Sequence, residues 1–207
     1  MRRVAKHIGI DRKTVARKLQ YLAEQAREAH TTALASPGIK TEYVQFDEME
    51  TYEVSKLKPL SIALAVRAKT GQILGAKVAE MNCHGKTASA SVRKYGRRTD
   101  GRMRATKSVL GNVVKVSKAK LTIATDKKQA YRTIIKQVLP GARHDVYASR
   151  TTVSTADPLF RLNHTCAKIR ADLSRMSRKT WSASKKATAL QDNLDVYVAY
   201  NNGYPFK

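Results

Sequence analysis

The chain has 207 residues, of which 42% are hydrophobic, so it can form one full domain and a smaller one. Its 40 lysines and arginines against 16 acids give a net charge of +24. This charge predicts a polyanionic partner and favours DNA or RNA over a membrane surface. No apolar run approaches the roughly 20 residues that span a bilayer, and the N-terminus has no signal peptide, so we expect a cytoplasmic protein. The two isolated cysteines, Cys83 and Cys166, exclude a zinc site of the CxxC type.

Residues 1–30 have the pattern of two helices separated by one turn. Gly9 marks the turn, Asp11 is placed to cap the second helix, and Val15 and Leu19 have helical spacing. This is the skeleton of a helix-turn-helix, whose second helix enters the major groove of DNA with its first residues on base edges. The candidate DNA contacts are then Arg12, Lys13, Thr14 and Arg17. The alternative is a helical hairpin with a solvated basic face.

A helix-turn-helix usually has a further helix before it, so we expect residues 1–30 to be an N-terminally truncated DNA-binding segment. Residues 31–41 contain Ser36-Pro37-Gly38, which predicts a helix stop and a linker. Residues 42–207 then alternate between strand and helix patterns, which predicts one α/β domain.

The elements expected in residues 42–207 follow a recognisable order. They are strands over 42–47, 60–67 and 73–79, a helix over 108–118, a strand ending at 126, a helix over 128–139, a strand over 146–148, and helices over 157–176 and 183–200. The Thr70-Gly71 turn makes the second and third strands a hairpin, and the strand–helix–strand unit adds parallel pairing. The order predicts an RNase H-like mixed five-stranded sheet with flanking helices, preceded by a partial all-α helix-turn-helix.

Two carboxylates end β-prone runs in this order. Asp47 follows Val44-Gln45-Phe46, and Asp126 follows Leu121–Thr125. In an RNase H-like sheet the first and fourth strands meet at the centre, so the two acids should lie together and could bind Mg²⁺, with Mn²⁺ as a substitute. Such a pair, in a strongly basic chain, predicts metal-dependent chemistry on nucleic acid phosphates.

Four segments resemble motifs of bacterial insertion-sequence transposases of the DDE type, InsA/InsB-like group. They are residues 13–19, 44–51, 122–126 and 173–181, and the resemblance extends from about residue 2 to 202. It implies a transposase on the bacterial nucleoid that binds double-stranded DNA at element ends and target. It further implies strand cleavage and transfer with Mg²⁺, and action as a homo-oligomer.

The third acid of the family pattern is missing. The family places a Glu on the helix that follows the fifth strand, but no Glu occurs after Glu80, and the corresponding position has Asn163. The resemblance therefore implies Asp47, Asp126 and Asn163 as catalytic residues and metal ligands. Asp157, the other acid nearby, is better interpreted as a helix cap before Pro158.

Further candidate DNA contacts come from basic segments. Residues 81–125 carry 11 basic residues and one acid, and the run around Tyr95 and Gly96 is expected to be a loop that binds phosphates, with a solvated face as the alternative. The candidates are Arg97, Arg98, Arg170, Arg178 and Lys179.

Two other functions are compatible with the sequence. A non-catalytic DNA-binding fragment, or a decayed transposase acting as a regulator, would explain the missing third acid. An RNase H-like nuclease for RNA–DNA hybrids is the other alternative, and the helix-turn-helix argues against it because that motif reads duplex DNA.

Overall fold

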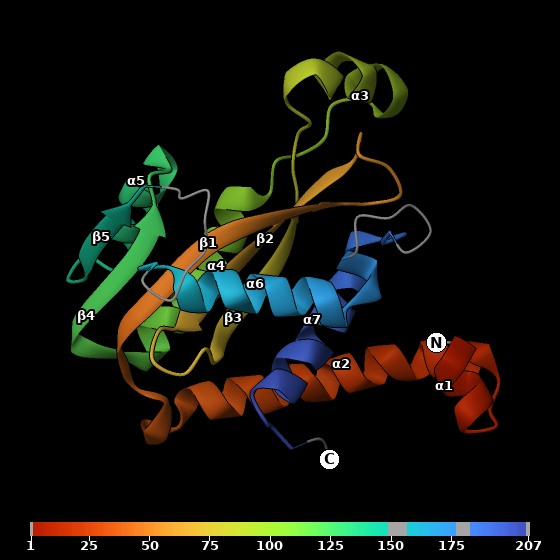
Figure 1. Ribbon diagram of the computed structural model, residues 1–207, viewed down its shortest axis with the longest axis horizontal. Helices are drawn as coiled ribbons and strands as arrows, with labels where there is room; N and C mark the ends of the chain where they lie inside the picture. Colours follow the sequence, from red (N-terminus) through yellow and green to blue (C-terminus); the bar gives the residue numbers. More distant parts are fainter. Residues whose placement is uncertain (1, 149–156, 177–182, 206–207) are drawn as a thin grey trace.

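A five-stranded mixed sheet forms the centre of the computed structural model, which describes residues 2–148, 157–176 and 183–205. Its strands are β1 (Thr41–Tyr52), β2 (Pro59–Arg67), β3 (Ile73–Glu80), β4 (Ser117–Asp126) and β5 (Arg143–Tyr147). The spatial order is β3-β2-β1-β4-β5, with β1, β2 and β3 antiparallel and β4 and β5 parallel to β1. The predicted RNase H-like mixed sheet with flanking helices is therefore confirmed (Figure 1).

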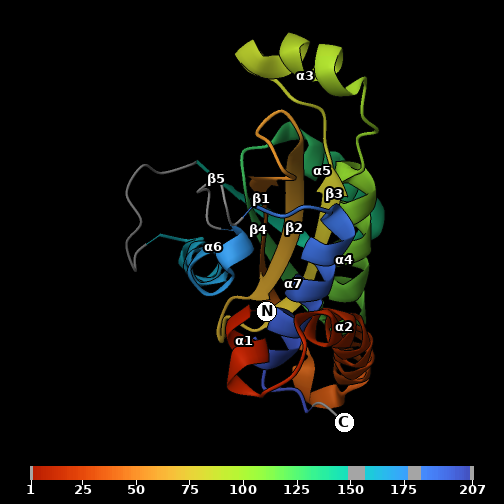
Figure 2. The same ribbon diagram turned by 90° about the vertical axis from the view of Figure 1, so that its right-hand side faces the viewer.

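Helices cover both faces of the sheet, so α4 and α6 lie on opposite sides of it in Figure 2. The helices are α1 (Arg2–His7), α2 (Arg12–Ala35), α3 (Ala88–Tyr95), α4 (Arg102–Val116), α5 (Gln129–Val138), α6 (Phe160–Asp172) and α7 (Ala187–Asn201), with 3-10 turns at Pro37–Ile39, Gly85–Thr87 and Ser174–Met176. Within the described residues, none of these helices has the length and apolar character needed to cross a membrane.

Alternation along β1 divides its side chains between two cores. Val44 and Phe46 belong to the core under α4 and α5, whereas Met49 belongs to the core under α6 and α7. The neighbouring strand β2 is buried along nearly its whole length, because helices cover both of its faces. These two cores hold β1 rigidly in the middle of the molecule.

The N-terminal segment has the predicted turn and cap but a longer second helix than expected. Gly9 has a φ of +66°, and the Asp11 carboxylate accepts a hydrogen bond from the Lys13 N–H at 2.7 Å. α2 continues to Ala35, so the first five residues of the expected 31–41 linker are helical. Arg27 fixes α2 to α7 through Asp195 at 2.8 Å. A continuous helix thus joins the N-terminus to the α/β domain.

Residues 81–101, here called the basic arm, correct another expectation. The run around Tyr95 was expected to be a loop, but α3 forms there and stands beyond the end of the sheet in Figures 1 and 2. Its anchor is the connection between β1 and β2, where the Ser91 hydroxyl donates to the Leu57 carbonyl at 2.6 Å. β1 is also longer than expected and carries this connection well past Asp47.

Candidate active site

The structure brings Asp47 and Asp126 together. β1 and β4 are parallel neighbours with Val44 opposite Ile123 and Gln45 opposite Ala124, and two further residues along both strands lead to Asp47 and Asp126. Adjacent strands are about 4.8 Å apart, so carboxylates in one row interact directly. The charge of Asp126 acts on Asp47 accordingly.

The environment of Asp47 favours its protonated form. Burial raises the pKa of Asp47 to about 6, and the negative charge of Asp126 adds to the rise. Hydrogen bonds oppose this shift: Asp47 Oδ1 accepts from the Glu48 N–H at 2.6 Å and from the Tyr131 hydroxyl at 3.1 Å. A buried carboxylate beside a second one is a hard-oxygen site where a cation would relieve the repulsion, so the pair fits a divalent metal ion as two of its ligands.

Asp126 is oriented by the turn that follows β4. Its Oδ1 accepts a hydrogen bond from the Lys128 N–H at 3.1 Å, which holds the carboxylate at the end of the strand. Asp126 is therefore the last residue of β4, and the hydrogen bond from the backbone of the following turn fixes the direction of its carboxylate.

Tyr131 on α5 is a site residue that the sequence analysis missed. Its ring is buried and lies edge-on to Phe46, with centroids 5.1 Å apart and an interplanar angle of 81°. Burial raises the pKa of Tyr131, and the charges of Asp47, Glu48 and Asp126 raise it further, so the phenol stays neutral and donates to Asp47. Tyr131 precedes Ile134 and Ile135 by three and four residues, and this spacing already places it on the apolar face of the expected helix.

Lys128 and Glu48 form a part-buried ion pair beside the acids. The Lys128 ammonium makes an ion pair with Glu48 and lies 5.1 Å from the centroid of the Tyr131 ring. Glu48 also accepts from the Thr106 hydroxyl at 3.0 Å. The positive charge of Lys128 lowers the pKa of Asp47, so it partly balances the acid pair.

The predicted third ligand, Asn163, is engaged elsewhere. Its side-chain N–H donates to Asp157 Oδ2 at 2.9 Å, while Asp157 Oδ1 accepts from the Leu159 N–H at 2.9 Å. The second contact closes a turn before α6, whose N-cap residue is Leu159 and not Asp157, so the expected helix cap is wrong by two residues. Among the described residues, no group of three His, Cys, Asp or Glu side chains is arranged to hold a metal ion.

Cys166 on α6 lies within reach of the charges of Asp47 and Arg170. The pKa of Cys166 is raised to about 12, mainly by burial; the charge of Arg170 opposes the rise, and that of Asp47 adds to it. The Leu162 N–H donates to Gln45 Oε1 at 2.8 Å, so one further helical turn brings Cys166 toward the level of Asp47 on β1. A neutral thiol is a poor ligand for Mg²⁺, whereas the Arg170 guanidinium could contact a phosphate.

Within the described residues, the predicted DNA contacts lie on α2, in the basic arm and, for Arg170, on α6. Arg12, Lys13, Thr14 and Arg17 are exposed on the first turns of α2, and Arg97 is exposed in the basic arm. Arg98 differs: its side chain is only 7% exposed, donates to the Pro59 carbonyl at 2.7 Å and pairs with Glu53 and Glu80. Its guanidinium is thus occupied within the protein, and Arg178 and Lys179 lie outside the described residues.

Comparisons with known proteins give distant structural similarity alone. No family model matches the chain, and no curated protein matches it. The chain is similar to a chain of the cryo-EM structure of the simian T-cell lymphotropic virus intasome in complex with PP2A regulatory subunit B56 gamma, with 12% sequence identity and a TM-score of 0.36. The similarity covers 78% of this chain and 49% of that chain, so this chain spans about half the length of that one. At this level the similarity does not identify a family.

Proposed function

We propose that this chain is an insertion-sequence transposase that binds element ends and cuts and transfers DNA strands with a metal ion at Asp47 and Asp126. The observation that carries the proposal is the part-buried, electrostatically coupled acid pair on adjacent parallel strands of an RNase H-like sheet. The net charge of +24 adds affinity for the phosphate backbone.

The residues around the pair suit phosphodiester chemistry. Mg²⁺, or Mn²⁺ in its place, would supply Lewis-acid activation of a water or 3′-hydroxyl and stabilise charge on the scissile phosphate. Asp47 and Asp126 would hold it, and Asn163 would contribute an uncharged amide oxygen. Tyr131 donates a hydrogen bond to the Asp47 carboxylate, and Arg170, whose charge acts on Cys166, would contact the phosphate.

DNA would extend from the acid pair along basic surfaces. The basic arm has no acid between Met81 and Thr99, and its exposed cations include Arg93, Lys94 and Arg97. The arm stands beyond the sheet on the extension of β1 that continues past Asp47 (Figure 1). The first turns of α2 provide the second surface, for the major groove.

The second candidate function is a DNA-binding regulator that does not cut. The observation that favours it is the composition of α6, where Cys166, and not an acid, lies within reach of the charge of Asp47, while Asn163 donates to Asp157. A centre with two carboxylates would bind a metal ion more weakly than one with three, because each carboxylate adds charge.

Nicking of supercoiled plasmid in Mg²⁺ or Mn²⁺ separates the two functions. The parent chain should nick, and Asp126→Ala should lose nicking while still shifting duplex DNA in a gel. Glu42→Ala is the matched control, because Glu42 is an exposed acid at the other end of β1. DNA binding without nicking by the parent would establish the regulator, and preferential cleavage of an RNA–DNA hybrid would establish a nuclease of another kind.

A further inference from the structure

The outer edge of β3 is also the edge of the whole sheet. The Val78 N–H points away from β2, because it donates to Gln191 Oε1 on α7 at 2.8 Å. In an antiparallel pair the N–H and C=O of one residue point the same way, and alternate residues share that direction. Ala76, Val78 and Glu80 therefore direct their backbone groups outward.

Side chains and a loop fill most of this edge. The Gln191 amide bridges the Ala76 carbonyl, at 3.1 Å, and the Val78 N–H, as one residue of a parallel strand would. The Asn202 side-chain amide accepts from the Ile73 N–H at 3.0 Å and donates to the Ile73 carbonyl at 2.8 Å. Such coverage is how sheets avoid adding strands from other chains.

One position on the edge is left open. The Val78 carbonyl and the Glu80 N–H have no hydrogen-bond partner among the described residues, whereas the next group, the Glu80 carbonyl, accepts from the Gly101 N–H at 2.9 Å. The two open groups flank Ala79. They have the same arrangement as the Ala76 carbonyl and the Val78 N–H, two residues earlier, which Gln191 bonds. Val78, Ala79 and Glu80 line a pocket of about 590 Å³ between β3, α4 and α7. Pockets of about 300–1,000 Å³ are typical of ligand sites.

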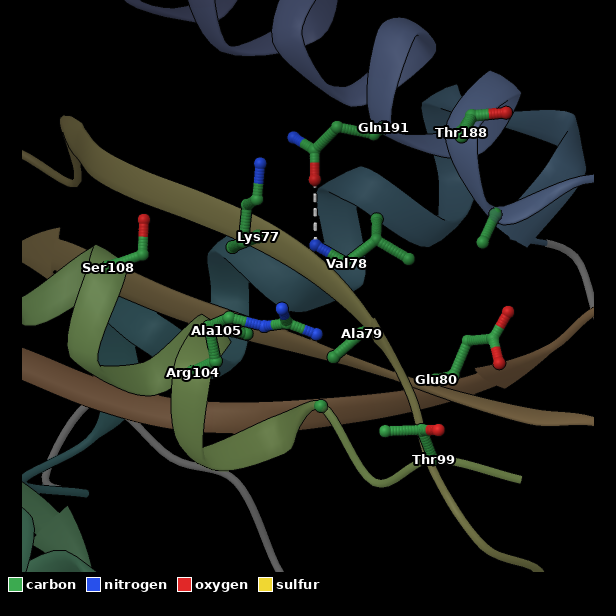
Figure 3. Close-up of a pocket in the computed structure, with 12 residues that line it drawn as sticks. Lys77, Val78, Ala79, Glu80, Thr99, Arg104, Ala105, Ser108, Thr188 and Gln191 are labelled. Atoms are coloured by element: carbon green, nitrogen blue, oxygen red, sulfur yellow. Dashed lines mark hydrogen bonds between the residues drawn. The ribbon is translucent and has the colours of Figure 1, made fainter. Parts of the chain in front are cut away.

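Figure 3 shows what else faces this pocket. Arg104 on α4 extends its guanidinium toward Ala79, and Lys77 also lines the pocket. Neither cation makes an ion pair or side-chain hydrogen bond with another described residue, although the charge of Lys77 reaches Asp195, which is already paired with Arg27. The walls near Ala79 are formed by small side chains such as Ala105 and Ala187.

We propose that this pocket binds a short extended peptide segment of a partner protein by adding it to β3 in parallel, with an acidic side chain at the residue opposite Ala79. That residue would donate its N–H to the Val78 carbonyl and accept from the Glu80 N–H. Paired residues direct their side chains to the same face. Ala79 faces the core under α4, so the acidic side chain meets Arg104. Backbone pairing gives affinity, and the charge gives specificity. The inference does not depend on the proposed function.

The test is a titration of the full chain, ¹⁵N-labelled, with the peptide Ac-Val-Glu-Val-NH₂, followed by the amide resonances. The Glu80 amide should shift most, because it gains a hydrogen bond, and Gly101 should follow. Methylating the Glu nitrogen of the peptide removes the donor to Val78 and should weaken binding about tenfold, the usual effect of one hydrogen bond. Arg104→Ala should weaken it similarly, and Arg132→Ala, which removes an exposed arginine from α5, should not.

Three outcomes would overturn the inference. The first is the absence of a Glu80 shift at millimolar peptide. The second is shifts spread over the basic surface with equal losses in Arg104→Ala and Arg132→Ala, which would mean general attraction to a chain of charge +24. The third is an Arg104-dependent Glu80 shift with inorganic phosphate or a short oligonucleotide but not with the peptide, which would assign the pocket to nucleic acid.

Discussion

Asp47 ties the stability of the protein to pH. Its pKa is about 6 in the folded chain and near 3.8 when unfolded, since burial and then Asp126 oppose its charge. Between these values the folded state binds more protons than the unfolded state, so stability falls as pH rises from 4 to 6 and stays lower above 6. The loss should be roughly 3 kcal/mol, because a difference of one pH unit between the two pKa values corresponds to about 1.4 kcal/mol.

Urea unfolding in EDTA at pH 4 and pH 7 measures this loss, with Asp47→Asn as the comparison. The substitution removes the titrating group, so the variant should lack this part of the pH dependence and gain stability relative to the parent at pH 7. Equal pH dependence in both proteins would show that Asp47 does not titrate in this range.

Tyr131→Phe tests the phenol that contacts Asp47. Loss of a hydrogen bond to the charged carboxylate should raise the pKa of Asp47, so the ascending limb of the pH profile of metal-dependent nicking should move up by roughly one pH unit. Tyr200→Phe is the control, because Tyr200 is 75% exposed. An unmoved profile in Tyr131→Phe would remove Tyr131 from the site.

The acid pair could be predicted from the sequence, whereas its partners could not. Asp47 and Asp126 end β-prone runs whose pairing follows from strand order. Tyr131 and Lys128 reach the pair only because α5 packs back against β1, a tertiary relation that has no local pattern. The neighbours of Asp47 on α6 depend on the placement of that helix, which spacing from Asp126 does not fix.

At the scale of elements, the basic arm has a buried arginine next to an exposed one. Arg98 is buried between Glu53, Glu80 and the Pro59 carbonyl, whereas Arg97 is exposed. Arg98→Ala should cost roughly 3 kcal/mol of unfolding free energy, because it leaves buried Glu53 without one of its cations. Arg97→Ala should leave stability unchanged and weaken DNA binding.

Urea unfolding and gel shifts on both variants check this contrast. A stable Arg98→Ala with weakened DNA binding would reverse the two roles. Stability lost equally in both variants would mean that the arm as a whole, and not Arg98, holds the structure.

Local patterns were sufficient for the sheet but not for two helices. The β2–β3 hairpin follows from the Thr70-Gly71 turn and strand alternation. α2 continues past its expected end because Leu34, in its last turn, is buried in the core of the folded chain. α3 is short and basic, and contacts with Leu57 from another part of the chain fix it.

At the scale of the whole molecule, two basic surfaces should engage one DNA. α2 joins the N-terminal cations to the α/β domain as a continuous helix, and the basic arm extends from the opposite end of the molecule (Figure 1). Removing one cation that neutralises a phosphate should reduce the slope of log K against log salt by about 0.9. The triple substitutions Arg12, Lys13 and Arg17→Ala, and Arg93, Lys94 and Arg97→Ala, should therefore each reduce it by up to about 3.

Binding to duplex DNA over a range of salt concentrations gives these slopes. Lys115, Arg132 and Lys136→Ala, which removes the same charge from α4 and α5, should change the slope much less. Equal changes in all three triple variants would mean that DNA is bound through net charge alone, without defined surfaces.

The central claim is that Asp47 and Asp126 hold one divalent cation, and cleavage of the protein by bound iron tests it most directly. Fe²⁺ in place of Mg²⁺, with ascorbate and peroxide, generates radicals that cut the backbone beside its ligands, and mass spectrometry locates the cuts. The account predicts cuts near residues 47 and 126 that excess Mg²⁺ suppresses and that Asp126→Ala loses. Cuts elsewhere with none near these two residues, or cuts unchanged in Asp126→Ala, would contradict it.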